Sequence, residues 1–137
     1  ALKTRSLVAP FFPHPGFERK RFDSSHAHSG RRSLRISPGG LRHFPLRLVP
    51  GRRYRISLWI RREGPEGKVF ANVWLPLQRK PHVFGHRNQP GRWVQVKTTY
   101  QMKKGHEQPR LYLYNWQGAK KPAWFDAVRV EDLGPAK

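Results

Sequence analysis

Prolines and glycines interrupt this chain before any helix-length segment develops. The 137 residues include 13 Pro and 12 Gly, scattered between short runs of Val, Ile, Leu and aromatic residues. No segment shows a sustained helical period with a cap at both ends. The pattern is typical of an all-β sandwich or barrel. Strands are expected at roughly residues 7–12, 16–22, 33–37, 41–49, 53–62, 68–75, 92–100, 110–116 and 124–131.

Turn-forming residues separate most of these runs, because Pro fixes φ and Gly allows a positive φ where the chain reverses. The longest irregular stretch is 76–91, which we interpret as a functional loop or a crossover between sheets. The chain has no Cys, so neither a disulfide framework nor a thiolate metal site is expected. No apolar run approaches the roughly 20 residues that span a bilayer. The expected turns lie at 38–40, 50–51, 63–67, 89–91 and 103–105.

Alternation gives three of the strands an aliphatic face and a second face of aromatic and polar residues. The strands are 53–62, 68–75 and 110–116. If they lie in one sheet, their second faces form a platform on which sugar rings or bases stack, with Arg and Asn as hydrogen-bond donors. The alternative is a face covered by loops or another subunit. The predicted platform residues are Arg55, Trp59, Asn72, Trp74, Arg110, Tyr112, Tyr114 and Trp116.

The charge balance is strongly positive. There are 28 Lys and Arg against 8 Asp and Glu, a formal net charge of +20. Such a field attracts nucleic acid, acidic polysaccharide, anionic lipid or an acidic protein. The eight acids are too scattered to indicate a glycosidase pair, and no nucleophile elbow or phosphate loop is present. The pairs His26/His28 and His82/His86 have no clear third metal ligand. We therefore expect a binding protein and not an enzyme.

The last strand contains one acid among apolar residues. By period two, Asp126 is expected on the same face as Val128 and Val130. A carboxylate in that position needs a cation or backbone N–H groups as partners. We expect Glu18 to lie at the same point, so that the first and last strands meet there.

Five stretches, at 15–18, 27–36, 50–60, 91–96 and 124–128, together resemble carbohydrate-binding modules of families four, nine and twenty-two. These are β-jelly-roll modules attached to glycoside hydrolases and also found in cell-surface and phage proteins. The resemblance implies an all-β jelly-roll sandwich of two antiparallel sheets. Residues 19–28 form a shorter segment than such modules usually have there, so one strand or binding loop is expected to be missing or shortened.

The resemblance also implies one structural calcium ion. The matching positions are Glu18, Gly30, Arg32 and Asp126, while Ala127 replaces a second Asp of the family pattern. Oxygen ligands suit such a hard cation. The alternative is that Arg31 or Arg32 pairs with the carboxylates and no ion binds.

The domain expected from these features is a single sandwich over residues 13–133, with an arm at 1–12 and a tail at 134–137. Its leading predicted function is non-catalytic binding of a glycan or polyanionic surface. One alternative is a structural or decorating subunit of an extracellular filament or virion, in which 2–12 reaches a second copy or an acidic protein. The other is sequence-independent nucleic-acid binding. An extracellular, cell-surface or virion location is expected, and the composition indicates a thermophile.

Overall fold

The computed structural model describes residues 5–8, 22–23, 33–75, 80–85, 88–105 and 108–136. Their regular structure is entirely β-strand. In this part of the chain no helix is long and apolar enough to cross a membrane. The strands are β1 (Arg5–Val8), β2 (Phe22–Asp23), β3 (Ser33–Ile36), β4 (Gly40–Pro45), β5 (Arg52–Arg62), β6 (Lys68–Leu75), β7 (Lys80–Phe84), β8 (Trp93–Met102), β9 (Arg110–Trp116) and β10 (Ala123–Pro135).

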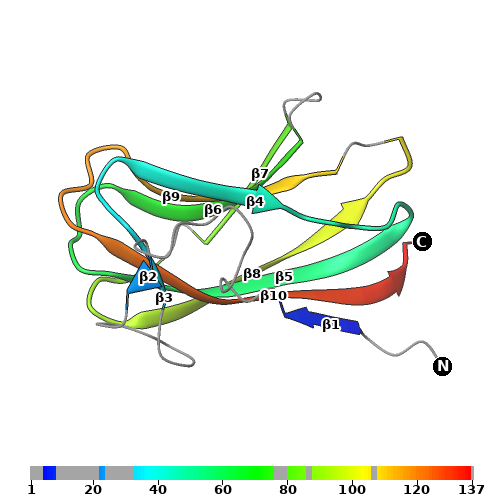
Figure 1. Ribbon diagram of the computed structural model, residues 1–137, viewed down its shortest axis with the longest axis horizontal. Coiled ribbons are helices and arrows are strands. Elements are labelled where there is room, and N and C mark those ends of the chain that lie inside the picture. The colour runs from blue at the N-terminus through cyan, green and yellow to red at the C-terminus, as the bar shows by residue number, and fades with distance from the viewer. Residues whose placement is uncertain are drawn as a thin grey trace.

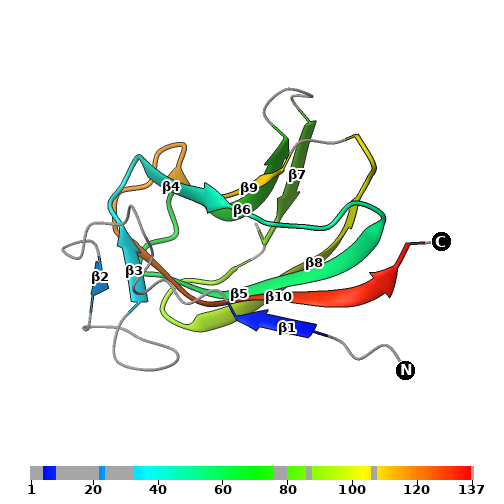
Figure 2. The same ribbon diagram turned by 45° about the vertical axis from the view of Figure 1, so that its right-hand side comes forward.

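These strands form two antiparallel sheets packed face to face (Figures 1 and 2). Sheet A has the order β2-β3-β10-β5-β8, with β1 also pairing with β10, and sheet B has the order β4-β9-β6-β7. From β4 onward the chain alternates between them, visiting B, A, B, B, A, B and A. The prediction of a jelly-roll sandwich with two antiparallel sheets is confirmed.

The core lies between the sheets and follows from the two-residue alternation. Each strand turns its aliphatic residues inward, where burying one Leu or Ile contributes roughly 1.5–3 kcal/mol. The opposite, outer faces carry the polar and aromatic residues that the sequence pattern separates from the core. Inward residues include Tyr54, Ile56, Leu58 and Ile60 from sheet A, and Val69, Ala71, Val73, Leu111 and Leu113 from sheet B.

Most predicted elements match the observed ones, with one strand missed. The strands at 53–62, 68–75 and 110–116 correspond to β5, β6 and β9. The expectation of an irregular stretch at 76–91 is wrong for 80–84, which form β7 at the edge of sheet B. Pro81 is tolerated there because an edge strand has N–H groups that need no ladder partner. The predicted turn glycines Gly39, Gly51, Gly67, Gly91 and Gly105 all have positive φ, between 77° and 87°.

A β-bulge in β10 changes the expected orientation of Asp126. The register with β5 shifts between Asp126, opposite Trp59, and Arg129, opposite Ser57. Ala127 has a φ of 53° at this irregularity. Asp126 therefore faces outward with Trp59, whereas Val128 is in the core. The prediction that Asp126 shares a face with Val128 was wrong, because one inserted residue reverses the alternation.

One buried cation connects the two sheets at the end of β5. The Arg62 guanidinium donates from Nε to the Gly64 carbonyl (2.8 Å) and from Nη2 to the carbonyls of Glu66 (2.9 Å) and Gly67 (2.7 Å). Its Nη1 donates to Asn88 Oδ1 (3.2 Å). Burial lowers the pKa of Arg62. Arg62 thus holds the turn through which the chain passes from sheet A to sheet B.

The N-terminal strand pairs within its own chain. Its register runs from Arg5 opposite Asp132 to Val8 opposite Arg129. The other residues of the expected arm at 1–12 lie outside the described part of the chain. That this arm also reaches a neighbour remains a prediction.

Candidate functional site

The outer face of sheet B carries a row of aromatic rings along β9. This strand lies between β4 and β6, so its outward side chains occupy the middle of the face. Tyr112 and Tyr114 have ring centroids 5.9 Å apart, and Tyr114 and Trp116 have centroids 5.1 Å apart, with the planes of each pair within 28°. Trp116 is 40% exposed, although large apolar side chains are usually buried.

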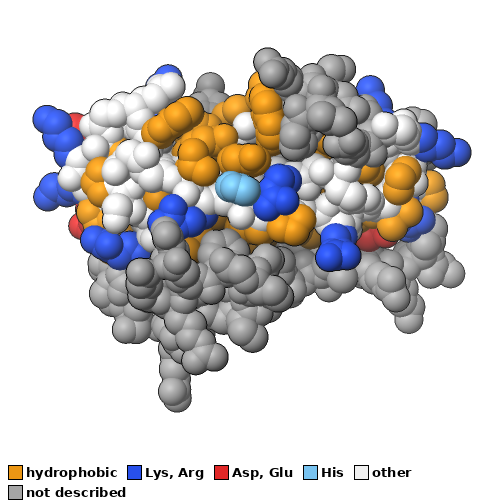
Figure 3. Space-filling view, turned by 45° about the horizontal axis from the view of Figure 1, so that its top comes forward, with side chains coloured by type: hydrophobic (Ala, Val, Ile, Leu, Met, Phe, Trp, Pro, Cys, Tyr) orange, Lys and Arg blue, Asp and Glu red, His pale blue; other side chains and the backbone are white. Residues whose placement is uncertain are grey.

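Neighbouring strands widen this row. Phe70 of β6 stacks on Tyr114 with centroids 4.6 Å apart, and His43 of β4 stacks on Tyr112 at 4.7 Å. We call His43, Phe70, Tyr112, Tyr114 and Trp116 the ring row. Figure 3 shows this side of the molecule, where hydrophobic side chains gather in a band with a histidine and basic side chains among them.

Hydrogen bonds position the polar groups beside the ring row. Arg110 Nε donates to His43 Nδ1 (2.9 Å), which requires an unprotonated Nδ1. Partial burial, and then the charge of Arg110, lower the pKa of His43. Asn72 is buried, and its Oδ1 accepts a hydrogen bond from the backbone N–H of His82 (2.8 Å). Asn72 also forms a side-chain hydrogen bond with Tyr114, but burial outweighs it and raises the pKa of Tyr114.

Most of the predicted platform is brought together on this face. Trp74 pairs with Arg110 and Asn72 with Tyr112, so the outward residues of β6 and β9 form one surface. Arg55 and Trp59 do not join it, because β5 belongs to sheet A. Their alternation was interpreted correctly, but the condition that all three strands share a sheet was wrong.

The platform prediction omitted two members of the ring row. The alternation of β6 places Phe70 on the same face as Asn72 and Trp74, but the predicted platform does not include it. His43 was missed, although its outward position between Arg42 and the buried Phe44 was available from the alternation of β4. The sequence signal for both residues is an aromatic ring on a neighbouring strand, directly opposite a tyrosine of β9.

The outer face of sheet A has a different character. It carries Trp59 and Trp93, which are half-buried, together with many cations. In the described part of the chain no group of three or more His, Cys, Asp or Glu is placed to hold a metal ion. Of the predicted calcium residues, Asp126 lies on this face and accepts a hydrogen bond from the Ala127 N–H (2.7 Å). Glu18, Gly30 and Arg32 lie outside the described residues, so the calcium site remains a prediction.

His82, from the predicted pair His82/His86, packs against β8 of the opposite sheet. His82 Nε2 lies 2.7 Å from Thr98 Oγ1, and the ring packs edge-on against Tyr100. Burial lowers the pKa of His82. His26, His28 and His86 lie outside the described residues.

Comparison with known proteins identifies the family to which this chain belongs. The sequence profile described as "Carbohydrate binding domain" matches residues 8–122. The chain therefore belongs to this family of carbohydrate-binding modules, and the predicted resemblance is confirmed. No curated protein sequence matches the chain.

Solved structures agree with this fold at low sequence identity. A xylan-binding domain of family 22 superposes with a TM-score of 0.65 at 12% identity, covering 96% of each chain. The C-terminal family 22 module of Clostridium thermocellum Xyn10B gives 0.60 at 12% identity, covering 100% of this chain and 86% of the other. A family 16 carbohydrate-binding module gives 0.60 at 14% identity, with coverages of 80% and 82%.

Family membership supports the leading functional prediction, a non-catalytic module that binds glycans. It favours neither the filament or virion subunit nor the nucleic-acid binder.

Proposed function

We propose that the ring row on sheet B is the glycan-binding surface and that it holds an extended polysaccharide chain. The observation that carries this proposal is a series of stacked rings across three strands, made of His43, Phe70, Tyr112, Tyr114 and Trp116. Aromatic rings provide flat apolar surface at little entropic cost, and sugar rings have apolar faces that match it. A row of several rings fits a chain of sugars better than a single sugar.

Polar groups at the edges of the row give the chain its orientation. Only Nε of Arg110 is used by His43, so other N–H groups of the guanidinium are available to sugar hydroxyls. The side-chain hydrogen bond from Asn72 holds the position of the Tyr114 hydroxyl. Rings for stacking with a few positioned donors are the usual composition of a small-ligand site.

Xylan is the first polymer to test, because two structural neighbours are described as xylan-binding domains. We also propose an extracellular location, because one structural neighbour joins such a module to an endo-xylanase. A structural calcium ion held through Asp126 is a further proposal, supported only by the family resemblance and the oxygen chemistry.

The test is a calorimetric titration with xylohexaose, and with cellohexaose for comparison. Replacing Tyr112→Ala together with Tyr114→Ala gives the ring-row variant, which should bind about tenfold more weakly for each ring removed. Thermal unfolding of the variant must first show that the sandwich is intact.

The matched control is Arg55→Ala, which removes an exposed side chain from the outer face of sheet A instead of sheet B. We expect its affinity for xylohexaose to equal that of the parent protein at a temperature where both are folded. If the two variants lost affinity for xylohexaose equally, or if the ring-row variant lost none, sheet B would not be the glycan-binding surface.

A further inference from the structure

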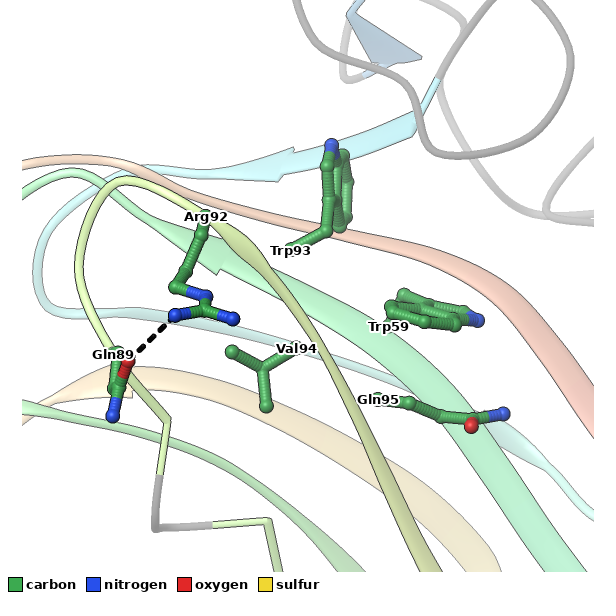
Figure 4. Close-up of a pocket in the computed structure, with 6 residues that line it drawn as sticks. All are labelled: Trp59, Gln89, Arg92, Trp93, Val94 and Gln95. Atoms are coloured by element: carbon green, nitrogen blue, oxygen red, sulfur yellow. Dashed lines mark hydrogen bonds between the residues drawn. The ribbon is translucent and has the colours of Figure 1, made fainter.

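A hollow lies on the other layer of the sandwich, apart from the ring row. A hollow of about 370 Å³ opens at the edge of sheet A, where β8 is the last strand (Figure 4). This volume is near the lower end of the range for small-molecule pockets, roughly 300–1,000 Å³. It therefore suits one or two sugar units and not a long chain. The lining residues are Trp59 from β5, Gln89 and Arg92 from the preceding turn, and Trp93, Val94 and Gln95 from β8.

Strand register brings the aromatic and amide groups together. Trp59 is paired with Gln95, and Arg61 with Trp93, so both indoles and the Gln95 amide lie next to one another on the outer face. Figure 4 shows Trp59 and Trp93 rising from adjacent strands, with Gln95 beside Trp59. Both indoles are half-buried, so their rings are held by packing while part of each remains accessible.

The turn that supplies the other polar groups is fixed to the sheet. Gly91 has a φ of 77°, and its N–H donates to the Arg62 carbonyl at 2.6 Å. Arg92 and Gln89 are both exposed, and Arg92 Nη1 donates to Gln89 Oε1 at 3.2 Å. Since a guanidinium has five N–H donors in a planar fork, Arg92 retains the groups needed to bind a carboxylate.

The surrounding charge favours an anion. By strand register, the described outer face of sheet A carries a clear excess of cations over acids. On the described outer face of sheet B, only Lys68 and Arg110 are charged. The cations on sheet A are Arg35, Arg53, Arg55, Arg61, Lys97 and Arg129, and the acids are Asp126 and Glu131.

We propose that this hollow is a second carbohydrate-binding site, specific for a sugar unit that carries a carboxylate, such as a uronic acid. The indoles of Trp59 and Trp93 contact the apolar face of the sugar. The amides of Gln89 and Gln95 bind its hydroxyls, and Arg92 binds the carboxylate. This site is separate from the ring row and does not depend on it, so the two proposals succeed or fail independently.

The probe is a short xylo-oligosaccharide with one glucuronic acid substituent, compared with the same molecule after reduction of its carboxyl group to an alcohol. Binding is followed by NMR through the indole N–H signals of the five tryptophans. In the ring-row variant, Tyr112→Ala with Tyr114→Ala, the acidic probe should still shift the Trp59 and Trp93 signals. The reduced probe should bind about tenfold more weakly there.

Replacing Arg92→Gln in that background should also weaken binding of the acidic probe about tenfold, and leave binding of the reduced probe unchanged. The matched control is Arg53→Gln, an exposed cation of the same face that does not line the hollow. Three results would each overturn the proposal: no shift at Trp59 and Trp93, equal affinity for the two probes, or equal effects of the two Arg substitutions. Failure of the ring row would instead appear as xylohexaose binding that the ring-row variant retains.

Discussion

The outer faces of the two sheets arise from the same strand pattern but differ in chemistry. On sheet B, the ring row spans three strands and only two charged side chains are described beside it. On sheet A, the half-buried Trp59 and Trp93 and the buried Trp124 lie among cations, some of which have acidic neighbours, such as Arg55 at 3.7 Å from Glu131. Apolar stacking therefore dominates one face and long-range charge the other. A protein with a net charge of +20 can bind an uncharged polymer on one side and an anionic group on the other.

This comparison also shows that a surface is defined by strand pairing and not by strand composition. Trp59 and Trp74 are both half-buried aromatic residues on outward faces of adjacent elements in the sequence. They lie on opposite sides of the sandwich because β5 pairs with β8 and β10, whereas β6 pairs with β7 and β9. Similar residues thus lie on two different faces of the sandwich.

The largest expected effect on stability comes from replacing Arg62, which holds the turn between β5 of sheet A and β6 of sheet B. Replacing Arg62→Met leaves the carbonyls of Gly64 and Gly67 and the Asn88 amide without their donor. Unsatisfied buried polar groups are costly, and we expect a loss of about 3 kcal/mol in the free energy of unfolding. Urea denaturation measures this loss.

The adjacent residue provides the control. Arg61 lies 3.6 Å from Glu63 on the outer face, and Arg61→Met should cost less than about 1 kcal/mol because partly exposed ion pairs contribute little. If the two substitutions were equally harmful, the turn between the sheets would not be held by Arg62.

The sequence predicts the fold and the inward or outward direction of most strand residues, because burial imposes a period of two on each strand. It does not predict which strands share a sheet, since pairing depends on partners far along the chain, and Trp59 was misassigned for this reason. Neither does it predict the bulge in β10, where Ala127 adopts a positive φ without the usual Gly or Asn. β7 was missed because Pro81 and Gly85 suggest a loop, although an edge strand accepts Pro.

A pH titration should distinguish the two faces with a smaller effect. The pKa of His43 lies below its ordinary value of about 6.5. As the pH falls below about 6.5 toward that lowered pKa, His43 gains a proton, loses the hydrogen bond from Arg110 and places a second cation beside it. We expect xylohexaose affinity to fall a few-fold between pH 7.5 and 5, and His43→Gln to remove this dependence.

The free energy of unfolding changes with pH in the same direction as the affinity does over that range. The unfolded chain protonates His43 and His82 at a higher pH than the folded chain does, so the free energy of unfolding rises with pH through this window. Because His82 lies between the sheets, His82→Gln should reduce the pH dependence of stability and leave that of binding unchanged. If His82→Gln, and not His43→Gln, abolished the pH dependence of binding, the ring row would not be the site.

The smallest effects concern backbone strain at two positions, one within a strand of sheet A and one in a turn beside sheet B. Ala127 in β10 of sheet A has a φ of 53°, and Gln117 after β9 of sheet B has a φ of 50°. A left-handed conformation costs a non-glycine residue roughly 1–2 kcal/mol. Replacement by glycine removes this cost, but glycine loses more conformational entropy on folding, so only part of the cost is recovered as stability. We expect Ala127→Gly and Gln117→Gly each to raise the free energy of unfolding by about 0.5 kcal/mol, measured by urea denaturation. Ala119→Gly, at a position without positive φ, should lower it by a similar amount. Because Ala127 interrupts a strand ladder and Gln117 lies in a connecting turn, a gain at Gln117 alone would mean that the β10 bulge is held by its neighbours in sheet A and not by its own backbone.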